Sequence, residues 1–387
     1  MFTIKTINNI SAKGLDRLPA EKYSINPDHE NPDAIILRSQ NLHDMEIPSN
    51  LKAVGRAGAG TNNVPVARLG EHGIVVFNAP GANANAVKEL VIAGMLLACR
   101  NICQAWQYTA NVEGTDEEQN KAVEAGKKKY VGYELPGRTL GVVGLGAIGV
   151  EIANAAVALG MRVVGFDPTI TVKSAWKMSS VVEEMSSVDE LLKEADFVTF
   201  HVPLIDATKN LLNSERITTM KDGAVILNFA RQGIVDDDAV LAAIKSGKLN
   251  AYVCDFPSEK LKRNERVITL PHLGASTVEA EENCAMMVAD QLKDFLESGN
   301  IKNSVNFPSV KLPRGGKTRV AITHKNMPDM IARISSAVGD AGYNIHHLRN
   351  ESQNDLAYTL MDIECEVDDD LIEKFAVIDG VLKARLV

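Results

Sequence analysis

The residues with the clearest chemical potential are an arginine, a glutamate and a histidine that each follow a short apolar run: Arg231, Glu259 and His272. An ordinary imidazole has a pKa near neutrality, which suits a general base. A nearby carboxylate orients such a ring and stabilises its protonated form. A planar guanidinium binds a carboxylate through two parallel hydrogen bonds. Singly, each residue type is more often structural, solvated or in a surface ion pair, but together the three indicate proton removal from a small hydroxy acid.

A glycine pattern supplies the second piece of chemistry. Gly144, Gly146 and Gly149 follow the apolar run 139–143 with the spacing of a dinucleotide-binding turn. The first glycine permits a tight turn, the second lets the backbone approach a pyrophosphate, and the third lets the next helix pack closely. The start of that helix offers unpaired N–H groups and a positive dipole end to phosphates. The alternative is a glycine turn in an ordinary βαβ unit, which the surrounding pattern disfavours.

Asp167 indicates which dinucleotide is bound. It ends the next expected strand, 161–166, about 20 residues beyond the last glycine, where the fingerprint places an acid on the adenine ribose. A carboxylate there repels a 2′-phosphate, and Pro168 and Thr169 provide no cation to attract one. The sequence therefore favours NAD over NADP as the cofactor.

The elements that must position these residues are strands alternating with helices between residues 97 and 282. Each apolar run ends in polar residues, as expected at the edge where open α/β sheets bind ligands. We predict an α/β protein with a Rossmann-type doubly wound NAD domain over 97–282. Its strands are expected at 139–143, 161–166, 197–200, 224–227, 251–254 and 267–270.

The flanking segments predict two further domains. Residues 1–96 together with 283–305 are expected to form a flavodoxin-like substrate (catalytic) domain, with a long helix over 278–297 returning to it. Residues 306–316 read as a linker. Residues 317–387 then follow a βαββαβ order, which is ferredoxin-like. This last domain lacks a nucleophile–base pair, so we expect a regulatory role for it.

Composition limits the classes of function. The chain has 387 residues, 45% of them hydrophobic, and a net charge of −9, which makes nucleic acid an improbable partner. No apolar run has the length of a membrane span, and the first residues lack a signal-peptide core. The five cysteines are odd in number and form no C-x-x-C pair, which favours reduced thiols in the cytoplasm. No metal site is predicted.

An acidic protein that binds an anion must gather cations locally. The basic run 127–129 is either a solvated turn or part of such an anion site, reaching a neighbouring subunit.

Taken together, the motifs resemble the D-isomer-specific 2-hydroxyacid dehydrogenase family over nearly all of residues 1–305. The resemblance rests on segments 55–60, 228–236, 256–259 and 271–277 and on the glycine fingerprint. It implies that Arg231, Glu259 and His272 are the catalytic set. The cofactor contacts expected from the resemblance and from the strand ends are Gly144, Gly146, Ala147, Ile148, Gly149, Asp167, His201, Val202, Pro203, Thr208, Phe229, Ala230, Arg231, Cys254, Asp255, His272 and Gly274.

Residues 317–387 resemble an ACT domain, a small amino-acid-sensing fold. The combination implies NAD-dependent oxidation of 3-phosphoglycerate to 3-phosphohydroxypyruvate, the entry to phosphorylated L-serine synthesis, by a homodimer or homotetramer. The substrate contacts that it implies are Arg38, Arg56, Ala57, Gly58, Asn83, Arg231 and His272. His324, Asn326 and Asn344 match positions that bind L-serine across a subunit interface in serine-inhibited members.

The chain departs from the family pattern at three points. Cys254 stands where the family usually has an acid, with Asp255 one place later, so either residue is a candidate for the nicotinamide contact. Lys260 follows Glu259 where proline is common, and Asp329 replaces a glycine after Met327 and Pro328.

Two other functions are compatible with the same motifs. The first is another D-2-hydroxyacid dehydrogenase or a hydroxypyruvate/glyoxylate reductase, whose unphosphorylated substrate needs fewer cations than Arg38 and Arg56 supply. The second is an NAD-sensing corepressor, which has no need for the set Arg231, Glu259 and His272.

Overall fold

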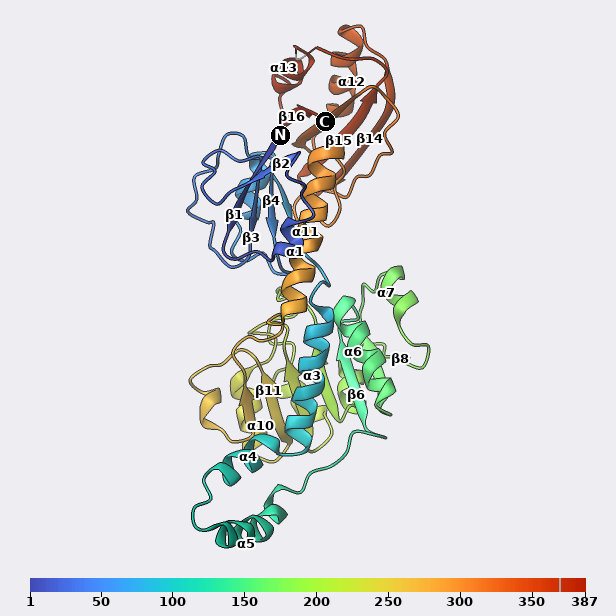
Figure 1. The fold of residues 1–387 in the computed structure, drawn as a ribbon. Helices are drawn as coiled ribbons and strands as arrows, with labels where there is room; N and C mark the ends of the chain where they lie inside the picture. The colour runs from blue at the N-terminus through green and yellow to red at the C-terminus, as the bar shows by residue number, and fades with distance from the viewer. Residues whose placement is uncertain (369) are drawn as a thin grey trace. The chain divides into compact units, whose positions relative to one another are not determined.

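The structure is a computed structural model that describes residues 1–368 and 370–387. It separates into two compact units, residues 83–277 and residues 1–82 with 278–387 (Figure 1). The first boundary lies earlier than the expected 96/97 because helix α3 (Ala84–Cys99) packs on the strands of the dinucleotide unit. The second lies at 277/278, rather than at 282/283, because α11 (Val278–Ser298) belongs whole to the other unit.

The dinucleotide unit, residues 83–277, contains a seven-stranded parallel sheet in the order β12-β11-β10-β9-β6-β7-β8. The chain therefore starts in the middle of the sheet at β6, adds β7 and β8 on one side, and then adds β9 to β12 on the other, as in doubly wound folds. The predicted Rossmann-type domain is confirmed. Its strands are β6 (Thr139–Val143), β7 (Arg162–Phe166), β8 (Glu183–Glu184), β9 (Phe197–Phe200), β10 (Ala224–Asn228), β11 (Leu249–Cys254) and β12 (Val267–Thr269).

Two hydrophobic cores cover the two faces of this sheet, because successive side chains of a strand point to opposite faces. Val142 packs with helices α3 and α6 (Ala147–Ala158) on one face. Val143 packs on the other face with helices α8 (Val188–Glu194), α9 (Ser214–Thr219) and α10 (Asp237–Lys245). Burial of both faces explains the near-continuous apolar runs that identified the strands.

Helices α4 (Ile102–Ala110) and α5 (Asp116–Gly126) form an arm beyond this sheet (Figure 1). The arm ends in the short helix η1 (Lys127–Tyr130). Thr115 and Glu118 form a capping box at the start of α5, which satisfies two of its unpaired N–H groups. The unit also holds the short helices α7 (Val172–Lys177) and η2 (Leu261–Arg263).

The substrate domain is a five-stranded parallel sheet in the order β2-β1-β3-β4-β5. This is the flavodoxin-like order 2-1-3-4-5, so that expectation is confirmed. The strands are β1 (Phe2–Ile7), β2 (Tyr23–Ile25), β3 (Ala34–Leu37), β4 (Ala53–Arg56) and β5 (Val75–Phe77). The first two were not predicted, because Lys5 and Thr6 interrupt the alternation in β1 and β2 is only three residues long. The helices are α1 (Ala12–Leu15), α2 (Val66–Glu71) and the long α11.

The C-terminal domain has the predicted ferredoxin-like order, with an antiparallel sheet β14-β15-β13-β16. Its elements are β13 (Thr318–Lys325), α12 (Met330–Asp340), β14 (Ile345–Gln353), β15 (Leu356–Ile363), α13 (Asp370–Ala376) and β16 (Val381–Leu386). The predicted second helix, 369–377, begins on residue 369, which lies outside the described residues. No described helix is both long enough and apolar enough to cross a bilayer.

Both faces of this antiparallel sheet are buried. Val320 and Ile322 pack under α12 and α13, whereas Ala321 and Tyr358 share a core with Phe295 of α11. The sheet also provides hydrogen-bond donors for the unpaired carbonyl oxygens at the carboxyl end of α11, which has no basic residue in its last turn. Side chains from the sheet donate to these carbonyl oxygens: Arg385 Nη1 to Leu296 at 3.2 Å, Arg319 Nη1 to Ser298 at 3.0 Å, and Tyr358 Oη to Gly299 at 2.6 Å.

A buried ion pair organises this junction. Arg319 and Asp362 are 1% and 0% exposed and form two hydrogen bonds, Nε–Oδ1 at 2.6 Å and Nη2–Oδ2 at 2.8 Å. Gly315 N also donates to Asp362 Oδ2 at 2.8 Å, which ties the preceding linker to the sheet. Although burial alone raises the pKa of Asp362, the hydrogen bonds from Arg319 and Gly315 outweigh it and hold the pKa below its usual value.

We expect Arg319→Met to lower the free energy of unfolding by about 3–5 kcal/mol, because it leaves Asp362 buried without its cation. Chemical denaturation measures this. The control is Glu351→Gln, which breaks the exposed Arg349–Glu351 pair and is expected to change stability by less than about 0.5 kcal/mol. Equal effects of the two substitutions would contradict the importance of the buried pair.

Candidate active site

The turn from β6 into α6 meets the three demands of a dinucleotide-binding turn. Gly144 has φ +94°, and a Cβ there would lie 2.7 Å from the carbonyl oxygen of His201. A Cβ on Gly149 would lie 1.9 Å from the carbonyl oxygen of Gly144, so the helix packs backbone to backbone. A Cβ on Gly146 would meet nothing within 4 Å, and this open space lies beside the first turn of α6, where Ala147 and Ile148 follow. The space is where a pyrophosphate would approach.

Asp167 is fixed at the carboxyl end of β7, the strand beside β6. Its Oδ2 accepts a hydrogen bond from Leu145 N at 2.8 Å, and its Oδ1 accepts one from Thr169 N at 2.9 Å. These bonds join the acid to the glycine turn. The carboxylate thus lies beside the open turn, in the position that an adenine ribose requires.

The loop after β9 lies against the same turn, since β9 is the other neighbour of β6. His201 Nε2 lies 2.7 Å from Thr199 Oγ1, and desolvation lowers the pKa of His201 to about 3, so its ring is neutral. Thr208 Oγ1 donates within the loop to Pro203 O at 2.5 Å, and Val202 contacts the position of Gly144. The loop is therefore held in a fixed shape at the sheet's switch point.

A buried asparagine that we did not predict holds the segment after β10. Asn228 is 1% exposed; its Nδ2 donates to Arg231 O at 2.9 Å and its Oδ1 accepts from Ala230 N at 3.2 Å. The backbone of Arg231 is fixed while its guanidinium remains exposed and donates to Ala230 O at 2.6 Å. Phe229 is buried against α3. The available signal was position: Asn228 is the first polar residue after the apolar run 224–227.

His272 lies in the loop after β12 in an unusual backbone conformation. Its φ is +42°, which is uncommon for a residue with a Cβ. His272 N donates to Asp255 O at 3.0 Å, and the rings of His272 and Phe256 lie 5.2 Å apart. The exposed ring is thus directed by its backbone and an aromatic neighbour, and such strain is often concentrated at functional sites.

Asp255 follows β11 and supports the loop that carries His272. It is 1% exposed, and its Oδ2 accepts from Gly274 N at 3.2 Å, whereas Oδ1 is buried without a hydrogen-bond partner among the described residues. Desolvation raises its pKa, although the hydrogen bond from Gly274 N and the electrostatic interactions with His272 and Arg231 oppose the shift. Arg231, Asp255 and His272 therefore come together at one sheet edge.

Cys254 faces the other way. Its thiol is fully buried in the core beneath α10 and contacts Phe256 O at 3.8 Å, and burial raises its pKa to about 11. Of the two candidates for the nicotinamide contact, Asp255 is the one on the side of His272.

Glu259 is expected beside His272, but the structure places its carboxylate elsewhere. Its carboxylate is 75% exposed and pairs with Arg263 at 2.8 Å, one helical turn further along the chain. The structure gives no contact between Glu259 and His272, so their pairing stays a prediction.

Three features of this edge fit an NAD molecule. The turn at Gly146 leaves room for a pyrophosphate, and Asp167 stands at the ribose position without a neighbouring cation in 168–169. The orphaned Oδ1 of Asp255 is a buried acceptor that a carboxamide N–H group would satisfy. Among the described residues, no group of side chains has the composition of a metal site.

In the substrate domain, two arginines follow neighbouring strands. Arg38 comes after β3 and pairs with Glu281 of α11 at 2.6 Å; Arg56 ends β4. The Arg56 guanidinium lies against Gly58, where a Cβ would be 1.7 Å from Nη1, and Ala57 beside it is buried. Burial raises the pKa of Cys284, and both arginines partly oppose this rise. Arg38 and Arg56 therefore form one cationic cluster.

Asn83 belongs to the dinucleotide unit, just before α3. It is 9% exposed and its Oδ1 has no hydrogen-bond partner among the described residues. This is a second orphaned acceptor at a predicted contact.

The predicted effector residues lie at two ends of the C-terminal sheet. His324 is 2% exposed; its Nδ1 lies 2.8 Å from Lys325 O and its Nε2 lies 2.9 Å from Thr359 Oγ1. Asn326 is exposed, and its Nδ2 donates to Asn354 O at 3.0 Å. His324 is paired with Ala357, while Asn344 directly precedes the pair Ile345–Ile363, so about 20 Å of strand separates them. A ligand touching all three residues therefore needs two chains.

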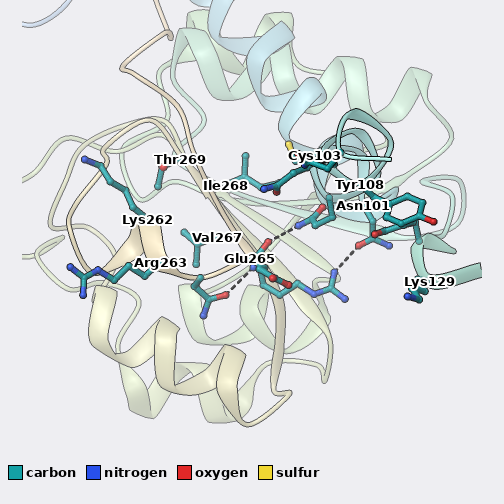
Figure 2. Close-up of a pocket in the computed structure, with 16 residues that line it drawn as sticks. Asn101, Cys103, Tyr108, Lys129, Lys262, Arg263, Glu265, Val267, Ile268 and Thr269 are labelled. Atoms are coloured by element: carbon teal, nitrogen blue, oxygen red, sulfur yellow. Dashed lines mark hydrogen bonds between the residues drawn. The ribbon is translucent and has the colours of Figure 1, made fainter. Parts of the chain in front are cut away.

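A pocket lies elsewhere in the dinucleotide unit (Figure 2). It encloses about 730 Å³ beside the segment 262–266, which precedes β12, so it lies at the opposite end of the strands from His272. Lys129 of the basic run lines it with Lys262 and Arg263, while Lys127 pairs with Glu124. Gln104 Nε2 donates to Glu265 O, which fixes α4 against this segment.

Comparison with known proteins agrees with the geometry. Residues 92–276 match the family model described as the D-isomer specific 2-hydroxyacid dehydrogenase NAD binding domain. A D-3-phosphoglycerate dehydrogenase of Haemophilus influenzae is 34% identical over 88% of this chain and 82% of its own length. One from Methanocaldococcus jannaschii is 37% identical over 81% of this chain and 59% of its own length. The chain thus spans only about three fifths of the length of some of its curated relatives.

Solved structures show the same fold. An NAD⁺-bound 3-phosphoglycerate dehydrogenase of Entamoeba histolytica matches with a TM-score of 0.61 and 25% identity, over 79% of this chain and 98% of its own. A D-mandelate dehydrogenase of Rhodotorula graminis matches with a TM-score of 0.67 and 25% identity, over 80% and 99%. The match to this family model and the identity with a relative covered over 82% of its length show that the chain belongs to the D-isomer specific 2-hydroxyacid dehydrogenase family.

Proposed function

We propose that the chain is a D-3-phosphoglycerate dehydrogenase, which oxidises 3-phosphoglycerate to 3-phosphohydroxypyruvate with NAD in the first step of phosphorylated L-serine synthesis. The observation that carries the proposal is that Arg231, Asp255 and His272 follow three neighbouring strands, β10, β11 and β12, at the same edge of the parallel sheet as the glycine turn. The names of the relatives support the choice of substrate. The cytoplasm is the proposed location, and a homodimer or homotetramer is the proposed assembly.

The proposed catalytic set retains the predicted roles. NAD, when bound, accepts the hydride from C2 of the substrate. His272 takes the proton of the 2-hydroxyl at an imidazole nitrogen, and Arg231 holds the substrate carboxylate. Glu259 is proposed to stabilise the protonated ring once its carboxylate leaves Arg263, an exposed pair that costs little to break.

The proposed cofactor contacts are the residues predicted from the sequence, with Asp255 in place of Cys254 for the carboxamide. The orphaned Oδ1 of Asp255 supports this choice, because satisfying a buried acceptor is worth more than adding a bond at the surface.

Arg38 and Arg56, with Ala57 and Gly58, are proposed to bind the phosphate and fix the substrate. Two guanidinium groups beside each other suit a dianion, since each forms charge-assisted hydrogen bonds with phosphate oxygens. Asn83 is the proposed polar contact from the dinucleotide unit.

The C-terminal domain is proposed to act as an ACT domain that binds L-serine between two chains, using His324 and Asn326 of one and Asn344 of the other. The separation of these residues along the sheet supports a site shared by two chains.

A second candidate is hydroxypyruvate reduction, because a hydroxypyruvate reductase of Thermotoga maritima is 36% identical over 66% of this chain and 80% of its own length. The two functions differ in their need for a phosphate-binding cluster.

The substrate is tested by NADH formation from 3-phosphoglycerate, with D-glycerate and D-lactate as controls, and by the reverse reaction with 3-phosphohydroxypyruvate. We expect Arg56→Gln to raise KM for 3-phosphoglycerate at least about tenfold while leaving KM for D-glycerate unchanged. Turnover of the unphosphorylated acids alone would favour the second candidate.

We expect His272→Ala to lower kcat by about 10²–10⁴-fold, because the general base is lost. NAD affinity is expected to change little. Steady-state kinetics and NADH fluorescence measure the two effects, and His347→Ala, an exposed histidine of the C-terminal domain, is the control. Near-normal turnover of the variant would show that another group is the base.

The glycine turn gives a matched pair of substitutions. Gly146→Ala is expected to raise Kd for NAD at least about tenfold without changing the melting temperature, because its Cβ meets only the open space of the turn. Gly149→Ala is expected to destabilise the apoprotein, since its Cβ clashes with Gly144 O. Gly339→Ala in α12, also in open space, serves as the control. Equal NAD affinities for Gly146→Ala and the wild type would contradict the assignment of the turn.

A further inference from the structure

A pocket of about 530 Å³ lies between the substrate domain and the C-terminal domain of the same unit. Its walls come from α2, the segment 305–306, the turn 353–356 between β14 and β15, and residues at the ends of β13 and β16. None of these residues belongs to the proposed catalytic, cofactor or substrate set. The pocket has the size of sites that hold small molecules.

One side of the pocket is aliphatic. Val66, Val305, Leu356 and Leu382 line it, and each is only partly buried. Val66 and Val305 pack at the edge of the substrate-domain core, and Leu356 and Leu382 pack on the core shared with α11. Apolar surface is therefore left open where two cores meet, and its burial would be favourable.

Three charged side chains line the same pocket: the acidic Glu71 and Asp355 and the basic Lys325. None of the three has a side-chain hydrogen bond or ion pair within the described part of the chain, and all are exposed. By contrast, the amide of Asn306 is fully used, accepting from Val76 N and donating to Ile74 O at 2.9 Å each. The pocket thus offers one positive and two negative side chains to a ligand, beside the fixed amide of Asn306.

We propose that this pocket binds a free α-amino acid with an aliphatic side chain. Lys325 binds its carboxylate, Glu71 and Asp355 bind its ammonium group, and the apolar side receives the side chain. A zwitterion can pair with the positive and the negative side chains at once. A simple anion would be repelled by Glu71 and Asp355, and a simple cation would be repelled by Lys325. The proposal does not depend on the substrate of the reaction.

The site is connected to the proposed effector loop. Asn326 N donates to Asp355 O at 2.8 Å, and Asn326 Nδ2 donates to Asn354 O at 3.0 Å. A ligand held by Asp355 therefore orders the turn that supports Asn326. Binding in the pocket and binding at Asn326 are expected to influence each other reciprocally.

Isothermal titration of the full-length apoprotein with L-leucine, up to about 10 mM, tests the proposal. We expect saturable binding, and at least about tenfold weaker binding of 4-methylpentanoate, which lacks the amine, and of isoamylamine, which lacks the carboxylate. L-serine, which cannot use the apolar side, is expected to bind this pocket more weakly than L-leucine.

The variants locate the binding. Glu71→Gln and Lys325→Gln are expected to raise Kd for L-leucine about tenfold or more, and Ala67→Phe, which fills the pocket from α2, is expected to abolish binding. The matched control is Lys317→Gln, an exposed lysine of the same domain outside the pocket. Absence of saturable binding, or equal affinity in Glu71→Gln, Ala67→Phe and the control, would overturn the proposal.

Discussion

The contact on which the dinucleotide unit depends is the approach of α6 to the end of β6, backbone against backbone. No side chain fits between Gly149 and the carbonyl oxygen of Gly144, and Gly144 itself adopts a φ open mainly to glycine. This closeness directs the first turn of α6 at the space over Gly146. It also brings Leu145 N within reach of Asp167, so one steric constraint places both groups that we propose to bind the cofactor, the first turn of α6 and Asp167.

The proposed catalytic residues Arg231 and His272 depend on a different kind of support, because buried polar residues hold their backbones. Asn228 holds the backbone of Arg231, and Asp255 holds the loop of His272 and Gly274. Both supporting residues are 1% exposed, so their hydrogen bonds are protected from water and the loops above them are fixed. Among the described residues, Oδ1 of Asp255 has no hydrogen-bond partner, so this part of the support is not satisfied by the chain.

The other unit is unified by α11. Its start carries Glu281, which pairs with Arg38, and its carboxyl end is satisfied by Arg319, Arg385 and Tyr358 of the C-terminal sheet. Because that sheet buries both faces, it is an integral part of the unit and not a domain held only by its linker. The helix α11 therefore links the C-terminal sheet directly to the cluster of Arg38 and Arg56.

Local patterns in the sequence predicted six of the seven strands of the dinucleotide unit, the glycine turn and the positions of Asp167, Arg231 and His272, but they missed the two-residue β8 and, in the substrate domain, β1 and β2. These features are local: a fixed spacing of glycines, or a polar residue after an apolar run, follows from the period of strands and the geometry of turns.

Packing in three dimensions determined which of these residues come into contact. It turned Asp255, and not Cys254, toward His272, paired Glu259 with Arg263, and moved α3 into the dinucleotide unit. It also buried Arg319 with Asp362, residues far apart in sequence. Such outcomes depend on which face of a strand meets which core and on which partners come close in space, and no local pattern encodes that information.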